Sequence, residues 1–199
     1  MQPGIVLDRA TRRAALGGIA GVTGFVGAWV LAGLSRDDYS AVDDAISRLA
    51  AADAPNRWAM TAGFVAFGIG VPIYSSALRR AVAGPAWLAA ALSGVTTLGV
   101  AAAPLGAADA AHNITATVGY VALAATPLLA APALRRRGDR VWATVSVLCG
   151  TSSAVLLTAS SFDPAHGLTQ RLGLGITDAW IVATAWAMWR HGRIGRATT

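Results

Sequence analysis

The chain is notable first for the charged residues that it lacks. Lysine and glutamate are absent, so all sixteen basic residues are arginine, all ten acidic residues are aspartate, and only 13% of the 199 residues are charged. Soluble domains usually carry about 25% charged residues, whereas 55% of this sequence is hydrophobic and its mean hydropathy is +0.53. A globular fold of this length cannot bury so much apolar surface. The composition therefore excludes an ordinary soluble domain and predicts a membrane protein.

Cysteine and the common catalytic motifs are also scarce. The single Cys149 excludes an intrachain disulfide and a cysteine-rich metal site. The sequence contains no Gly-x-Ser-x-Gly, His-Glu-x-x-His or P-loop motif. A pI near 11.0 would suit a nucleic-acid partner, but the arginines stand in short clusters between apolar runs, which is a membrane-topology signal. We therefore predict that the protein does not bind nucleic acid and that membrane lipids are its partners.

Six apolar runs are present, each about as long as the 20 residues that a membrane-spanning helix needs. They cover residues 13–34, 58–78, 85–105, 113–134, 141–161 and 172–189. These runs predict an all-α polytopic fold in which residues 13–190 form one bundle of six transmembrane helices. An N-terminal arm at 1–12 and a basic tail at 191–199 flank the bundle.

The distribution of arginine predicts the orientation of the bundle. With the N-terminus inside, the inner segments hold twelve of the sixteen arginines, whereas the outer segments hold seven of the ten aspartates. Positively charged loops stay in the cytoplasm, and the richness in alanine, glycine and arginine is typical of a GC-rich bacterial genome. We expect a cytoplasmic (inner) membrane protein with both termini in the cytoplasm. The sequence is compatible with a protein partner and with a homo-oligomer.

The longest polar segment, residues 35–57, is predicted to carry a short amphipathic helix on the outer face. Ser40 reads as its N-cap, and Val42, Ile46 and Leu49 recur at helical spacing on one side. Such a helix lies on the membrane surface or packs over the bundle, and a lid over a site is the alternative.

Two Asp-x-x-His pairs are the candidate catalytic and metal-binding residues. Asp109 and His112 precede the fourth run, Asp163 and His166 precede the sixth, and each pair shares one helix face at this spacing. Four such groups together could hold a divalent metal with a water for hydrolysis, or handle protons. Alternatively, the aspartates only cap helices. The surrounding segments also align with an offset of 54 residues, which is compatible with a repeated two-helix unit.

Asp178 is the one acidic residue predicted to lie well inside a span, and it marks a candidate intramembrane polar site. An ionised carboxylate there costs several kcal/mol unless it has a partner. Arg171, seven residues earlier, lies nearly on the same helix face. The pair is either a structural ion pair or part of a proton relay or substrate contact. No cofactor-binding motif accompanies it.

Three segments resemble one known family. They are Tyr39–Phe64, which begins Tyr-Ser-Ala-Val-Asp-Asp; the stretch from Pro104 to His112; and the Gly-Leu-Thr-Gln-Arg at 167–171. Together they are similar to the bacterial and archaeal membrane proteins called domain of unknown function 998. Three additional residues, 106–108, separate Pro104 from Asp109 here, which departs from the family pattern. The resemblance implies six spans and brings no known activity.

Two functions stay open at this point, and the sequence does not decide whether the protein is an enzyme. The first is a non-enzymatic membrane protein that binds or moves a lipid or small molecule, or supports a partner in the envelope. The alternative is a membrane-embedded hydrolase, metal-dependent or not, that acts at the outer leaflet.

Overall fold

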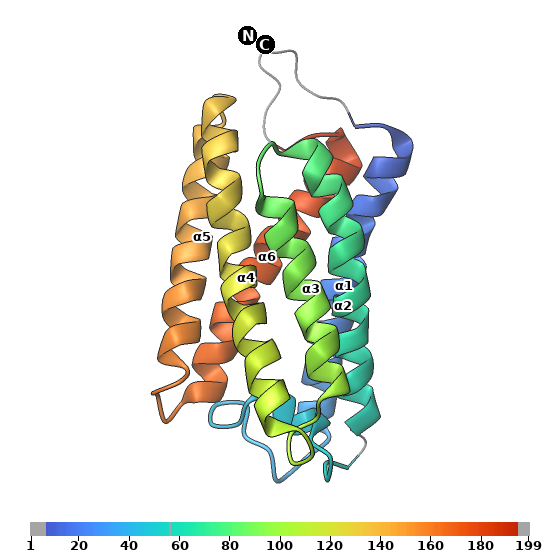
Figure 1. Cartoon of the computed structure of the whole chain (residues 1–199), viewed down its shortest axis with the longest axis vertical. Coiled ribbons are helices and arrows are strands. Elements are labelled where there is room, and N and C mark those ends of the chain that lie inside the picture. Colours follow the sequence, from blue (N-terminus) through green and yellow to red (C-terminus); the bar gives the residue numbers. More distant parts are fainter. Residues whose placement is uncertain (1–6, 56, 195–199) are drawn as a thin grey trace.

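The computed structural model describes residues 7–55 and 57–194, and this part of the chain forms helices and no strand (Figure 1). The six α-helices are α1 (Arg9–Leu34), α2 (Arg57–Ala81), α3 (Ala86–Ala102), α4 (Asp109–Arg136), α5 (Arg140–Ala159) and α6 (His166–His191), and the 3₁₀ helix η1 (Ile46–Ala50) follows α1. Each α-helix packs against its neighbours in sequence, and α6 also packs against α1. The helices therefore close a ring, in which α6 runs obliquely to the others (Figure 1).

The structure confirms the prediction of an all-α membrane protein, but not the predicted number of six membrane-spanning helices. Four of them, α1, α2, α4 and α5, are long and apolar enough to cross a bilayer. Helix α3 is apolar but has 17 residues, about 26 Å at 1.5 Å per residue. Helix α6 is long enough, with 26 residues, but it carries several polar side chains.

The connections gather at two opposite ends of the ring (Figure 1). One end, which we call the terminal end, holds the first residues of α1, the last residues of α6 and the connections 82–85 and 137–139. The other, the cap end, holds the connections 35–55, 103–108 and 160–165. The described arginines that the sequence assigns to the inner side all lie toward the terminal end, so the charge asymmetry of the sequence is also an asymmetry of the folded molecule.

Several boundaries differ from the prediction. Helix α1 begins four residues early because Asp8 is its N-cap and accepts a 2.7 Å hydrogen bond from the Thr11 N–H. Helix α6 begins at His166 and not at 172, so Gln170 and Arg171 belong to the helix. Of the predicted arm, residues 1–6 lie outside the described part, as do residues 195–199 of the basic tail.

The predicted amphipathic helix is wrong in its position. Ser40 closes a turn with Asp43, donating to its carboxylate at 2.6 Å and accepting from its N–H at 3.2 Å, and no helix follows directly. The 3₁₀ helix starts only at Ile46. Ile46 and Leu49 are buried, whereas Val42 is 46% exposed. We call residues 35–55 the cap, because its 3₁₀ helix packs against α1 and α2 at this end of the ring.

Candidate functional site

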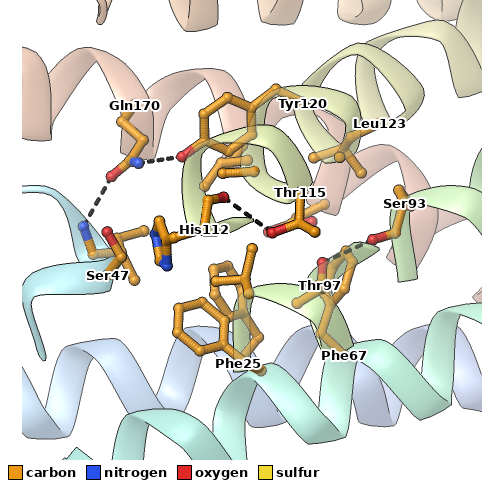
Figure 2. Close-up of a pocket in the computed structure, with 17 residues that line it drawn as sticks. Phe25, Ser47, Phe67, Ser93, Thr97, His112, Thr115, Tyr120, Leu123 and Gln170 are labelled. Carbon is orange, nitrogen blue, oxygen red and sulfur yellow. Dashed lines mark hydrogen bonds between the residues drawn. The ribbon is translucent and has the colours of Figure 1, made fainter. Parts of the chain in front are cut away.

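A partly open cavity of about 60 Å³ lies in the cap half of the ring, which is room for about four water molecules. Phe25, Phe64 and Phe67 form an aromatic wall, with the Phe25 ring centroid 5.9 Å from that of Phe64 and 5.5 Å from that of Phe67. The remaining walls mix aliphatic and polar side chains. The polar ones are Ser47, Ser93, Thr97, His112, Thr115, Tyr120 and Gln170 (Figure 2). Asp178 also lines the cavity. A mostly apolar cavity with a few convergent polar groups has the character of a small-molecule site.

Asp178 is the acidic residue of this cavity. Its side chain is 3% exposed, and its Oδ1 atom has no hydrogen-bond partner among the described residues. It lies twelve residues into α6, about 18 Å from the start of the helix, which is close to the middle of the helix. A buried, ionised carboxylate without a partner is costly. Asp178 therefore needs a proton, a water molecule or a ligand beside it.

Arg171 is not the partner of Asp178, so of the two alternatives for this pair the structural ion pair is wrong. The Arg171 guanidinium donates to the carbonyl oxygens of Ala41, Asp44 and Gly167 at 2.8, 2.9 and 2.7 Å, and also to the Tyr39 hydroxyl. It also lies over the Trp29 ring, 5.2 Å from the centroid. Three of these acceptors, on Tyr39, Ala41 and Asp44, lie in the cap close to the start of α6. The long side chain therefore extends toward the cap end, away from Asp178.

The Gly-Leu-Thr-Gln-Arg segment as a whole fastens the cap to α6. The Leu168 N–H donates to the Val42 carbonyl at 2.9 Å. Gln170 accepts from the Ile46 N–H at 2.9 Å and donates to the Tyr120 hydroxyl. Gly167 permits the approach, since a Cβ there would lie 2.4 Å from the Asp44 carbonyl oxygen. The segment that carried part of the family resemblance is therefore the attachment of the cap.

His112 is the predicted site residue that reaches the cavity together with Asp178. Its side chain is 4% exposed, and Nδ1 lies 2.8 Å from the Ala103 carbonyl oxygen. Because a carbonyl only accepts, Nδ1 carries the hydrogen in this bond. In the neutral ring the remaining nitrogen, Nε2, is then free to accept a hydrogen bond.

The other three candidates lie away from the cavity. Asp109 is exposed and accepts from the Gly106 N–H at 2.7 Å, Asp163 accepts from the Ala165 N–H at 2.8 Å, and His166 is part-exposed. Neither aspartate makes an N-cap bond to its helix, because the N-cap positions are Ala108 and Ala165. The predicted capping is therefore wrong in detail.

The predicted four-residue metal site is not formed. No three His, Cys or Asp side chains within 7–55 and 57–194 could hold a metal ion together. The physical reason is helix phase. His112 is one turn inside α4 and faces the ring, whereas His166 is the first residue of α6. The equal spacing in the sequence therefore does not produce equal positions in space.

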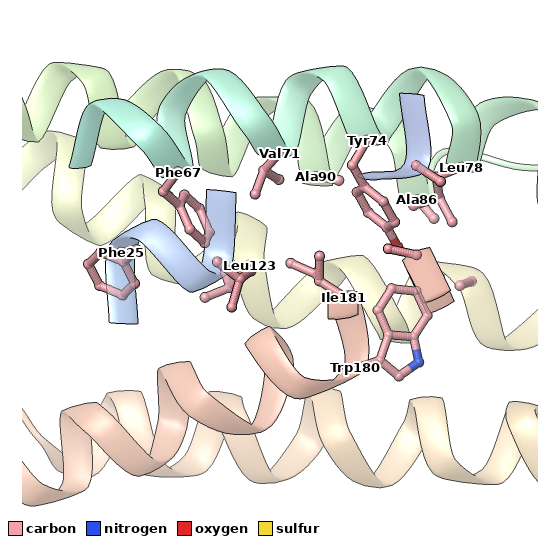
Figure 3. Packing of buried hydrophobic residues seen from close by; sticks show 14 of the residues in the cluster. Phe25, Phe67, Val71, Tyr74, Leu78, Ala86, Ala90, Leu123, Trp180 and Ile181 are labelled. Carbon is pink, nitrogen blue, oxygen red and sulfur yellow. The ribbon is translucent and has the colours of Figure 1, made fainter. Parts of the chain in front are cut away.

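Beyond the cavity, toward the terminal end, the ring is filled with side chains (Figure 3). Tyr74, Trp180 and Ile181 are 0, 2 and 0% exposed. Their polar atoms are paired: the Tyr74 hydroxyl lies 2.7 Å from Thr184 Oγ1, and the Trp180 indole N–H donates to Ser146 Oγ at 2.9 Å. Access to the cavity from the terminal end is therefore closed.

Several cavity residues were not predicted from the sequence. The aromatic wall consists of phenylalanines that look like ordinary lipid-facing or core residues in an apolar run. Ser47 lies in the 3₁₀ helix of the cap, and Gln170 was noted only as part of the family resemblance. Because the predicted sixth run begins at residue 172, Gln170 lies outside it in the sequence prediction, and only the earlier start of α6 places this amide within the helix.

Comparison with known proteins places the chain in a family without a described activity. Residues 19–187 match the family described as "Protein of unknown function (DUF998)", so the chain belongs to this family. The match includes the cap and reaches into all six helices. Neither a curated protein nor a solved structure matches the chain.

Proposed function

We propose that this member of the DUF998 family binds a small molecule that carries a positive charge, inside the ring of helices. The observation that supports this most directly is Asp178, a buried carboxyl that faces the cavity and has no cationic partner among the described residues. A cationic group beside Asp178 would neutralise the carboxylate and remove the cost of its burial.

The aromatic wall supports the same class of ligand. The faces of phenylalanine rings attract ammonium groups, most strongly where water is excluded. Phe25, Phe64 and Phe67 line the cavity together with Asp178. Hydroxyl groups, His112 and Gln170 would orient the ligand by hydrogen bonds. This combination of a carboxylate and aromatic rings favours an amine over an anion or a long acyl chain.

The size of the cavity restricts the ligand further. A volume of about 60 Å³ accepts ammonium or a short alkylamine, and a larger molecule would require the cap to move. The cap is the route of entry in this proposal, because the ring is filled on the other side of Asp178. Protons compete for the same carboxyl group, so binding should weaken as the pH falls.

The membrane arrangement is part of the proposal. All six helices cross the cytoplasmic membrane, the cap faces outward and both termini face the cytoplasm, as the arginine distribution supports. Reporter fusions at the C-terminus and within the connection 137–139 test this arrangement. Activity of a cytoplasmic reporter is expected at both positions, and an external signal at either would overturn the orientation.

Ligand binding to the full-length protein in detergent or nanodiscs tests the function. We expect ammonium, methylammonium and ethylammonium to raise the thermal unfolding temperature and to give a saturable binding isotherm. Methanol and ethanol, similar in size and uncharged, should have no effect. Asp178→Asn should abolish the response, whereas Asp139→Asn at the terminal end should keep it. Equal responses in both variants, or none in the wild-type protein, would refute the proposal.

A second candidate function rests on another pair of residues. Ser47 and His112 both line the cavity (Figure 2). The free Nε2 of a neutral His112 could accept the Ser47 proton as the hydroxyl attacks an ester carbonyl and pass it to the departing alcohol, and water would then hydrolyse the acyl-serine. The hydrolase alternative therefore moves from the Asp-x-x-His pairs to this serine. A fluorophosphonate probe should label the wild-type protein and not Ser47→Ala. Absence of labelling in the wild-type protein would eliminate this candidate.

A further inference from the structure

A second concave site lies between α4 and α5 near the terminal end, on the opposite half of the bundle from the cap. It is an open groove of about 700 Å³, within the size range of sites that hold drug-sized ligands. Its walls are mainly apolar, and two arginines, Arg135 at the end of α4 and Arg140 at the start of α5, stand at one end of it. We call it the α4–α5 groove.

The depth of the groove suits a lipid chain. From Arg135 back to Leu128 the groove follows seven residues of α4, and from Arg140 to Leu148 it follows eight residues of α5, about 10 and 12 Å along the two axes. At Gly150 the helices touch: a Cβ there would lie 2.5 Å from Leu128 Cγ. The groove is therefore apolar from the arginines inward and closes where the helices meet.

The two arginines are available for a ligand. Both are exposed, and neither forms an ion pair with an acid among residues 7–55 and 57–194. By contrast, the neighbouring Arg137 donates to the Ala81 carbonyl and joins α4 to the end of α2. The nearest acid in sequence, Asp139, makes no side-chain cap bond to α5, so the first N–H groups of that helix also face the same region without a side-chain partner.

We propose that the α4–α5 groove binds an anionic phospholipid. The phosphate lies between Arg135 and Arg140, and one acyl chain follows the apolar walls past Pro132 and Val147 toward Leu128. Basic pockets between membrane helices bind anionic headgroups in this manner. Charge complementarity selects an anionic lipid, and the membrane supplies it at the depth where the arginines lie. The inference does not depend on the ligand of the inner cavity.

Native mass spectrometry of the delipidated full-length protein tests the proposal, with phosphatidylglycerol and phosphatidylcholine of identical acyl chains. Phosphatidylglycerol should bind more tightly. The double variant Arg135→Gln/Arg140→Gln should lose about 30-fold in affinity for it, at the strength that juxtamembrane arginines have toward anionic lipids. The control Arg13→Gln/Arg136→Gln removes the same charge from exposed positions outside the groove and should retain the affinity.

Two further arms decide between a lipid site and simple charge attraction. Thr144→Trp, which fills the groove and keeps both arginines, should also weaken phosphatidylglycerol binding, and glycerol 3-phosphate should fail to compete with the lipid. An equal loss in the control double variant would show diffuse attraction and overturn the proposal. Efficient competition by glycerol 3-phosphate would show that the acyl chain is not bound, and would overturn it as well.

Discussion

The same helices pack differently in the terminal half and in the cap half of the ring. In the terminal half, α2 and α6 bring Tyr74, Trp180 and Ile181 together at close to zero exposure (Figure 3), and their polar atoms are paired. In the cap half, the same two helices contribute Phe67 and Asp178 to a cavity. The comparison shows that the terminal half is filled by side chains, whereas the cap half keeps a cavity in which the proposed ligand would bind.

Polar groups show the difference most clearly. In the terminal half the hydroxyl groups of Tyr74 and Thr184 satisfy each other. In the cap half, Asp178 Oδ1 and Thr177 Oγ1, on adjacent residues of α6, have no partner within the described ranges. Buried polar atoms are almost always hydrogen-bonded in native proteins, and exceptions call for an explanation. For Asp178 the explanation is a hydrogen bond to a water or to a bound molecule in the cavity.

The largest effect is expected where α1 and α2 approach most closely. A Cβ on Gly70 would lie 2.5 Å from the Gly17 carbonyl oxygen and 2.7 Å from Gly21 Cα. These are backbone atoms that cannot rotate away, so Gly70→Val should separate the helices and abolish the elution peak of the folded protein in detergent size-exclusion chromatography. Gly27→Ala on α1, where a Cβ meets nothing within 4 Å, should elute as the wild-type protein does. A folded Gly70→Val protein would contradict the close contact.

One substitution made twice on α4 tests the two halves directly. Ala130 is 0% exposed in the filled half, so Ala130→Leu should overpack the core and cost about 1–3 kcal/mol. Ala116 lines the cavity, so Ala116→Leu should be tolerated or stabilising, and should block ammonium binding. Chemical unfolding of both variants measures the difference. Equal destabilisation would mean that the two halves are equally packed.

A smaller effect is expected at the attachment of the cap. Gly167→Ala places a Cβ 2.4 Å from the Asp44 carbonyl oxygen and should loosen the cap without unfolding the ring. In a Cys149→Ala background, Ser47→Cys should then react faster with a water-soluble maleimide. Gly175→Ala, on the same helix with nothing within 4 Å, is the matched control. An unchanged labelling rate would show that the cap does not depend on this contact.

The smallest effect concerns the N-cap of α1 at the terminal end. The Thr11 N–H, hydrogen-bonded to the Asp8 carboxylate, lowers the pKa of Asp8 below its ordinary 3.8. The stabilisation by this ionised cap is therefore present above pH 3.8 and is lost as the pH falls below that value. Asp8→Ala should remove this part of the pH dependence from thermal unfolding curves. The cavity ligand should still bind, since Asp8 lies at the other end of the ring.

Much of the fold could be predicted because its signals are local. Apolar runs of about 20 residues locate the helices to within a few residues, and Arg clusters separate the two ends. The predicted helix boundaries are wrong where local hydrogen bonds or contacts with a distant segment decide the structure. Helix α6 begins six residues early, and there the cap supplies acceptors for Arg171 and a donor for Gln170. The 3₁₀ helix of the cap was misplaced because Ser40 and Asp43 close a turn of their own.

The sequence by itself determined that this is a helical membrane protein with charged ends of opposite character, because hydrophobic length and charge act on each segment separately. Only the tertiary structure decided which polar residues meet. The two Asp-x-x-His pairs look equivalent in sequence, yet His112 reaches the cavity and His166 does not. The physical reason is that the rotation of each helix about its axis depends on contacts with its neighbours, such as the close approach of Gly17 and Gly70, and no local pattern records that rotation.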